Sequence, residues 1–121
     1  MQRRAAPVSP STEEQVMTAP EDVQHVEVTE GGRLLASADV VGDEHAAVAA
    51  LHVEAGQLPA GTRTRLVDAV LDAPTVAGAE RLTTAGPAGD AEVADRLRER
   101  LDDVELRAAG STTFTDGTVP H

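Results

Sequence analysis

The sequence changes from a strand pattern to a helix pattern within the segment AAVAALHVEAGQLPAGTRTRLVDAVL, residues 46–71. Its first part, Ala46–Glu54, is a short run rich in Ala and Val that is bounded by turn residues, which is typical of a strand. Its second part places apolar residues at helical spacing: Leu66, Val67, Val70 and Leu71. Thr62 is a suitable N-cap, and Pro74 stops the helix. The segment therefore predicts a strand, a loop and a helix over Gly61–Asp72.

Two more strands are predicted upstream, at Val23–Thr29 and Arg33–Val41, with Gly31-Gly32 between them. A three-residue loop over residues 30–32 sets Val28 against Leu34, apolar against apolar. We prefer it to a two-residue turn, because a one-residue slip exchanges the two faces of a strand.

In the next hairpin, pairing Ala38 with Ala49 also places apolar residues of the two strands on the same face of the sheet. One face then carries only apolar side chains: Leu34, Ala36, Ala38, Val40, Ala47, Ala49, Leu51 and Val53. The other face carries His25, Glu27, Leu35, Ser37, Asp39, His52 and Glu54, with Arg33 opposite Glu54. We expect the first face to be buried.

Downstream, the pattern predicts a strand at Ala79–Ala85, a helix with Asp90 as its N-cap, and a last strand at Val104–Ala109. The predicted order is β-β-β-α-β-α-β, an α+β fold with a mixed sheet of about five strands and two helices. A strand–helix–strand crossover places its strands parallel, so Ala46–Glu54 and Ala79–Ala85 should run in the same direction.

The length and composition limit the function. The chain has 121 residues and a net charge of −11; all ten basic residues are Arg, and Phe114 is the single aromatic residue. Such a chain has neither the positive charge nor the rings for nucleic acid. It has no Cys for disulfides or thiol chemistry, and no run of about 20 apolar residues for a membrane span. Ala, Val and Leu supply nearly all of the apolar residues, and Lys, Asn and Ile are absent, which indicates a GC-rich coding bias and an actinobacterial-like composition.

The domain limits follow from the same sequence. We expect a flexible N-terminal tail over residues 1–20, one α+β domain over residues 21–115 and a C-terminal tail over residues 116–121. Without a secretion or membrane signal, we expect a cytoplasmic protein.

Polar residues on the exposed strand face offer one candidate for chemistry. His52 and Glu54 could act as a base and its partner, and His25 could join them in a zinc site. A solvated sheet face with an Arg33–Glu54 ion pair explains the same residues, and no recognised ligand spacing is present. We therefore assign no metal site and no catalytic residue.

The segment Ala49–Leu71 resembles the central part of the GNAT acyltransferase family, in which a strand ends in a loop of pattern [QR]-x-x-G-x-[GA] and enters a helix. Backbone N–H groups at that helix start hold the pyrophosphate of acyl-CoA. The resemblance implies acetyl-CoA or CoA as cofactor, and Gln57, Gly61, Thr62 and Arg63 as the residues that bind it. It covers about half of the chain.

This sequence departs from the family pattern in several ways. Ala60 and Thr62 occupy the two small positions, and Pro59 removes an N–H donor. The tyrosine that often serves as general acid has no counterpart in a chain without Tyr. The family's first strand and two helices are also missing. The resemblance implies a reduced GNAT-like fold.

Two functions are compatible with this pattern. The first is a non-catalytic domain that acts by self-association, as a homodimer, or by binding another protein chain through Leu35, Val48 and Ala50. The alternative is an acyl-CoA-binding or N-acyltransferase domain. No nucleic-acid or membrane partner is expected. The loop Gln57–Arg63 discriminates between the two, because ligand binding requires it to be open.

Overall fold

The computed structural model describes residues 23–121; the predicted N-terminal tail lies outside these residues. They form a mixed six-stranded sheet in the order β2-β3-β4-β5-β7-β6. The strands are β2 (Gln24–Glu30), β3 (Arg33–Gly42), β4 (Ala46–Val53), β5 (Arg81–Pro87), β6 (Asp102–Ala109) and β7 (Thr112–Thr118). The helices are α2 (Thr62–Asp72), α3 (Pro74–Ala77) and α4 (Ala91–Arg100). The α+β class is confirmed.

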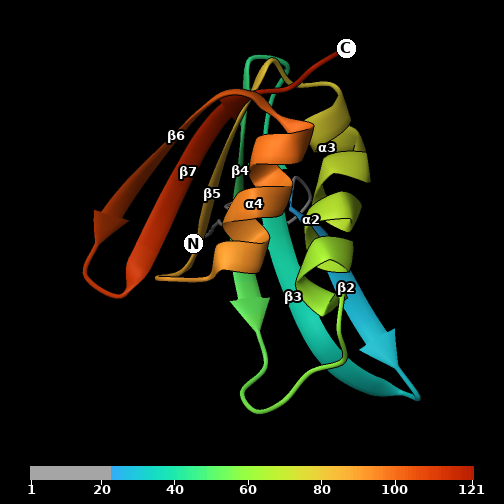
Figure 1. Cartoon of the computed structure of the whole chain (residues 1–121). Coiled ribbons are helices and arrows are strands. Elements are labelled where there is room, and N and C mark those ends of the chain that lie inside the picture. Colours follow the sequence, from blue (N-terminus) through green and yellow to red (C-terminus); the bar gives the residue numbers. More distant parts are fainter. Residues whose placement is uncertain (1–22) are drawn as a thin grey trace, which may run out of the picture.

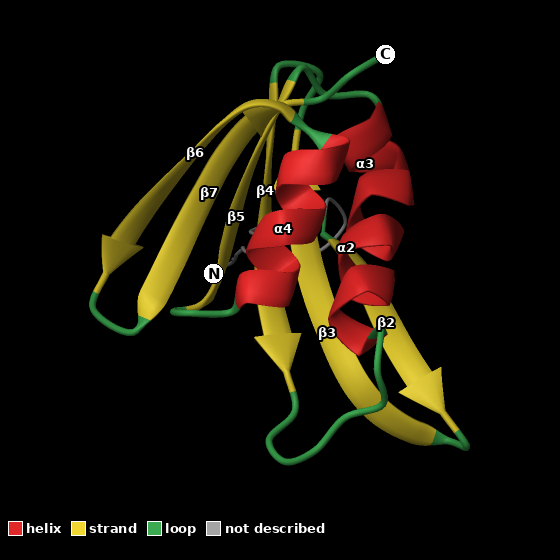
Figure 2. Ribbon diagram, viewed as in Figure 1, coloured by secondary structure: helices red, strands yellow, loops and turns green. Residues whose placement is uncertain are grey.

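The three helices lie on one face of the sheet, with α4 beside α2 (Figures 1 and 2). β4 and β5 pair in parallel, as the crossover rule predicts, and the other neighbouring strands are antiparallel. In the described part of the chain, no helix is both long and apolar enough to cross a membrane.

Two elements go beyond the predicted order. α3 is a single turn that begins at Pro74, where proline suits the first helical position. β7 is a sixth strand, in a region where we expected a tail from residue 116. It extends to Thr118, and Val119 is buried beyond it. Its threonines favour a strand, and it fills the gap between β5 and β6.

The first hairpin differs from the predicted register. Glu30 pairs with Arg33, so the turn is the two-residue Gly31-Gly32, and both glycines have positive φ angles of 60° and 80°. Val28 pairs with Ala36 rather than with Leu34.

A β-bulge in β3 allows the two-residue turn and still places apolar residues of β2 and β3 on the same face of the sheet. Thr29 pairs with Leu34 and Val28 with Ala36, so Leu35 is an extra residue on β3. A bulge re-aims side chains, and Leu35 joins Ala36 in the core with 1% of its surface exposed. Leu34, predicted to be buried, is 37% exposed. The placement of Leu35 on the outer face was therefore wrong.

The second hairpin keeps the predicted face but shifts by two residues, because Ala38 pairs with Leu51 rather than with Ala49. A two-residue shift leaves the same side chains on each face. The buried face therefore contains most of the predicted residues: Ala36, Ala38, Val40, Ala47, Ala49 and Leu51. The apolar residues of α2, Leu66, Val67, Val70 and Leu71, cover it.

Candidate functional site

The parallel pair β4–β5 separates before either strand ends. Its ladder joins Ala46–Ala50 to Arg81–Ala85. Beyond it, Leu51–Val53 remain paired with β3, whereas Gly86 and Pro87 remain paired with β7. The two facing edges therefore diverge, and a cavity of about 430 Å³ lies between them.

Both strands lead from this cavity into helices. The loop 54–61 connects β4 to α2, and the short turn 88–90 connects β5 to α4, so both helices begin at the end of the sheet where the strands diverge (Figure 1). A second cavity, of about 500 Å³, lies at these helix starts and is lined by Glu54, Arg63, Asp90 and Glu92. Helix N-termini favour negative ligands, whereas the three carboxylates oppose them.

The first turn of α2 is held by its own loop. Gly61 is the N-cap residue, with φ at 84°, and offers no side-chain cap. This left-handed conformation suits glycine, and beyond its chain neighbours no atom lies within 4 Å of where a Cβ would be. Both the N–H and the hydroxyl of Thr62 donate to the carbonyl of Pro59, at 3.2 and 2.7 Å. Thr62 is 1% exposed, so its side chain belongs to the core.

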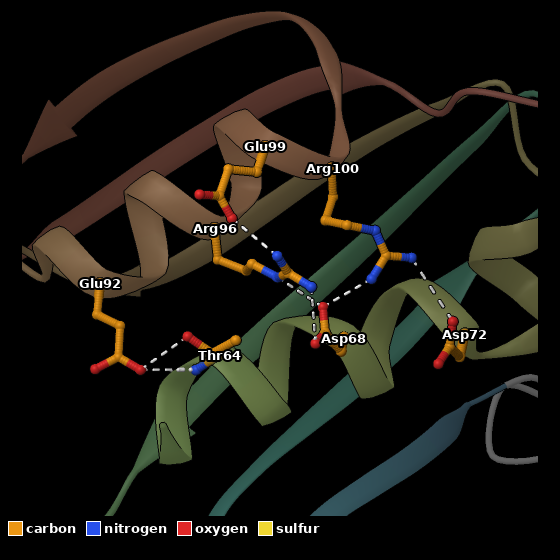
Figure 3. A network of polar contacts seen from close by, with 7 residues as sticks. All are labelled: Thr64, Asp68, Asp72, Glu92, Arg96, Glu99 and Arg100. Carbon is orange, nitrogen blue, oxygen red and sulfur yellow. Dashed lines mark hydrogen bonds and ion pairs between the residues drawn. The ribbon is translucent and has the colours of Figure 1, made fainter. Parts of the chain in front are cut away.

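Two acidic residues from the start of α4 cap and neutralise the start of α2. Arg63 Nε donates to Asp90 Oδ2 at 2.6 Å. The N–H and hydroxyl of Thr64 both donate to Glu92 Oε2 at 3.0 Å (Figure 3). Asp90 also accepts from the Val93 N–H, which confirms its predicted role as N-cap of α4. Arg63 and the Thr64 N–H at the start of α2 are therefore already paired with carboxylates of the same chain.

Further along, an ion-pair network holds the two helices together (Figure 3). Asp68 accepts hydrogen bonds from Arg96 at 2.9 Å and from Arg100 at 2.7 Å. The Arg96 guanidinium, together with Arg100, holds the pKa of Asp68 below its ordinary value, against the effect of burial. The network fixes α4 against α2, and so fixes the distance between the two helix starts.

The four residues predicted to bind CoA lie along this region in different settings. Gln57 is exposed in the loop, Gly61 and Arg63 lie at the α2 start, and the Thr62 side chain points inward. The sequence predicts Asp90 only as the N-cap of α4 and does not indicate that Asp90 and Glu92 contact α2. Their contacts with α2 span 27 and 28 residues, and no local pattern indicates them.

The face of the sheet opposite the helices gathers a different polar cluster. His25 bonds to Asp39 at 2.7 Å and to Glu27 at 2.9 Å, and His52 lies 3.8 Å from Asp39. The hydrogen bonds to Asp39 and Glu27 raise the pKa of His25 above its ordinary 6.5. No ion pair within residues 23–121 joins Arg33 to Glu54. In the same residues, no cluster of three or more His, Asp or Glu side chains has an arrangement that could hold a metal ion.

Comparison with known proteins finds no matching family model and no matching curated protein. Solved structures do share the fold. One is yncA of Salmonella typhimurium, a proposed acetyltransferase solved with its cofactor acetyl-CoA, at a TM-score of 0.59 and 12% identity. The match covers 82% of this chain and 66% of yncA, so this chain spans slightly less than two thirds of that protein.

Two further structures agree with it. The acetyltransferase of the GNAT family from Streptococcus pneumoniae gives a TM-score of 0.58 at 9% identity, over 84% of this chain and 70% of that one. Ribosomal-protein-alanine N-acetyltransferase from Brucella melitensis gives a TM-score of 0.55 at 15% identity, over 83% of this chain and 71% of that one. The chain has a GNAT-like fold. The expected resemblance is thereby confirmed at the level of fold.

Proposed function

We propose that this GNAT-like domain binds acyl-CoA between β4 and β5 and belongs functionally with the N-acyltransferases. The observation that carries the proposal is the divergence of the parallel pair after Ala50 and Ala85, beside the starts of α2 and α4. The binding of acetyl-CoA by yncA, which shares the fold, supports it.

The diverging edges suit the arm of CoA that carries the thioester. Leu51–Val53 and Gly86–Pro87 are paired on their outer sides only, so each inner edge can offer backbone groups to a ligand. An extended molecule with amide groups can pair with such an edge as an added strand does. The pantetheine arm of CoA, which contains two amides, is a ligand of this kind.

The phosphates of CoA would lie at the α2 start, near Gln57, Gly61 and Arg63. In this position they compete with Glu92 for the Thr64 N–H and with Asp90 for Arg63. A diphosphate carries more negative charge than one carboxylate, so it can replace these contacts at the cost of repulsion from the acidic wall. Binding of CoA is therefore expected to be weak and sensitive to salt.

His52 is the candidate general base of the transfer. It lines the cavity between the strands, on the side opposite the helices, and is 60% exposed. An amine that approaches from that side would attack the thioester carbon; the carbon–sulfur bond would break, the amine proton would pass to His52 and the thiolate would leave.

The test of binding is thermal unfolding, followed by far-UV circular dichroism, with CoA and acetyl-CoA. A ligand at about 100 times its Kd adds about 2.7 kcal/mol, or several degrees in Tm for a domain of this size. An unchanged Tm with millimolar ligand, in both low and moderate salt, would contradict the proposal.

We also propose that the domain self-associates through its outer sheet face. Val41 and Val48 pair directly on neighbouring strands and are 41% and 47% exposed. Leu35, which we expected on this face, is in the core and makes no contribution. Two adjacent exposed valines on neighbouring strands can pack against the same pair of a second copy.

A further inference from the structure

A third cavity, of about 200 Å³, lies under the first half of α4. Its walls come from the end of β4, from β5, from β7 and from β6, and they are mostly apolar: Leu51, Pro87, Val93 and Leu106. None of the residues predicted to bind CoA lines it. Since Leu51 and Gly86 border both this cavity and the gap between β4 and β5, the two spaces adjoin.

Small side chains produce this cavity. α4 presents Ala91 and Ala94 to it, and β5 presents Gly86, where a Cβ would lie 3.5 Å from Leu51. At the outer wall, Leu106 keeps 36% of its surface exposed. A well-packed core would place larger residues here, because interiors normally leave few voids larger than a water molecule.

Two hydroxyl groups break the apolar lining. Thr84 and Thr115 pair across β5 and β7 and are 2% and 3% exposed, and both line the cavity. Among residues 23–121 neither hydroxyl has a hydrogen-bond partner. Buried hydroxyls are normally satisfied, so this pair is suited to an oxygen atom brought by a ligand.

We infer that this cavity holds the acyl group of the thioester, and that the group is a short chain of about four to six heavy atoms that carries an oxygen. An apolar cavity of about 150 Å³ is known to hold a benzene-sized molecule, so 200 Å³ accommodates such a chain and is too small to enclose a long one. A 3-hydroxybutyryl group has this size and chemistry. The inference rests on the proposed thioester binding and specifies its substrate class.

The experiment measures binding by calorimetry for two matched series. The first contains CoA and its acetyl, butyryl, 3-hydroxybutyryl and decanoyl thioesters; the second contains the same acyl groups on N-acetylcysteamine, which has no phosphate. Each buried methylene contributes about fourfold to affinity, so butyryl, with two more methylenes, should exceed acetyl by about fifteenfold. The 3-hydroxybutyryl group should exceed butyryl, and decanoyl should bind least.

Variants locate the effect. Ala94→Leu fills the cavity and should abolish the preference for butyryl over acetyl, whereas Ala108→Leu, at an exposed position of β6 outside the cavity, should retain it. Thr84→Val keeps the volume and removes the donor, so it should remove the advantage of 3-hydroxybutyryl alone. Circular dichroism of each variant shows whether it folds.

The outcomes separate the two proposals. Equal binding of every CoA compound would overturn the acyl cavity and leave CoA binding intact. Chain preference in the N-acetylcysteamine series without binding of any CoA compound would support the cavity and overturn the CoA function. Tightest binding of acetyl or decanoyl, or no binding in either series, would overturn the inference.

Discussion

Asp90 Oδ2 lies 2.6 Å from Arg63 Nε, while the other oxygen of the same carboxylate caps α4 at the Val93 N–H. One side chain therefore connects the starts of two helices that come from different crossovers. Beside it, Glu92 caps α2 through Thr64. The position that a diphosphate would occupy is thus already filled with negative charge, so a diphosphate has to compete with Asp90 and Glu92.

Replacing Glu92 by Gln should strengthen CoA binding several-fold at low salt, because the competing carboxylate loses its charge while an amide oxygen remains to accept from Thr64. Glu105→Gln, at an exposed position of β6, makes the same change in net charge away from the site and should leave the Kd unchanged. Titration calorimetry measures both. Weaker binding of Glu92→Gln than of wild type would mean that Glu92 assists the ligand.

Replacing Asp68 by Asn should lower the free energy of unfolding by about 1–2 kcal/mol at pH 7, since Arg96 and Arg100 lose their shared charged partner. The depressed pKa of Asp68 stabilises the fold above pH 3.8, and this contribution disappears as the pH falls through the folded pKa. Urea unfolding of wild type and Asp68→Asn should therefore converge in strong acid.

Asp72→Asn is the matched control for that change. Asp72 is 75% exposed and lies 3.7 Å from Arg100, so its loss should cost less than about 0.5 kcal/mol. Equal effects of the two substitutions would show that Asp68 has no special role in holding α4 against α2.

His25 should titrate above pH 6.5, because Asp39 and Glu27 hydrogen-bond to its protonated ring. Its contribution to stability is then complete below 6.5 and is lost as the pH rises through the folded pKa. Nuclear magnetic resonance of the ring protons gives the pKa directly. Asp39→Asn should bring it back toward 6.5, and an unchanged value in that variant would rule out Asp39 as the main cause.

Leu35→Ala should cost about 2–4 kcal/mol of unfolding free energy, as for other buried leucines, whereas Leu34→Ala should cost less than about 1 kcal/mol. The two neighbours differ only because the bulge turns Leu35 inward. If Leu34→Ala were the more damaging change, the register with the three-residue loop would be correct after all.

Val48→Glu should dissociate a dimer formed through the outer sheet face, because it places a charge in an apolar contact of two copies. Ala77→Glu, at an exposed position of α3 on the helix side, adds the same charge elsewhere and should leave the mass unchanged. Light scattering measures the mass of each. A wild-type protein that is already monomeric at high concentration would reject this face as an interface.

Local sequence patterns predicted most of the helices and strands, because the apolar spacing of a helix and the turn residues that end it lie within a few positions of each other in the sequence. The helix at residues 62–72 and the cap at Asp90 are examples. Leu35 was misplaced because a bulge adds one residue to β3, and nothing adjacent to it indicates this. β7 was missed because its stability comes from its two neighbours rather than from its own few apolar residues.

The candidate site was harder to predict for a similar reason. Gly61 and Arg63 were found from a loop pattern, but the residues that decide what they can bind lie 27 and more positions away. The cavity under α4 forms because Ala91, Ala94 and Gly86 have small side chains or none. A sequence shows that these residues are small but not that they face one another in the fold.

The short ladder between β4 and β5 has a mechanical consequence. It divides the described chain into two halves that are each continuous in sequence, residues 24–77 and residues 81–118, and each half pairs its own strands antiparallel. The halves are joined in the sheet by five residue pairs only. A ligand bound between them would connect both halves at this short ladder, so bound ligand should slow hydrogen exchange most at Ala46–Ala50 and Arg81–Ala85, where the sheet joins the two halves.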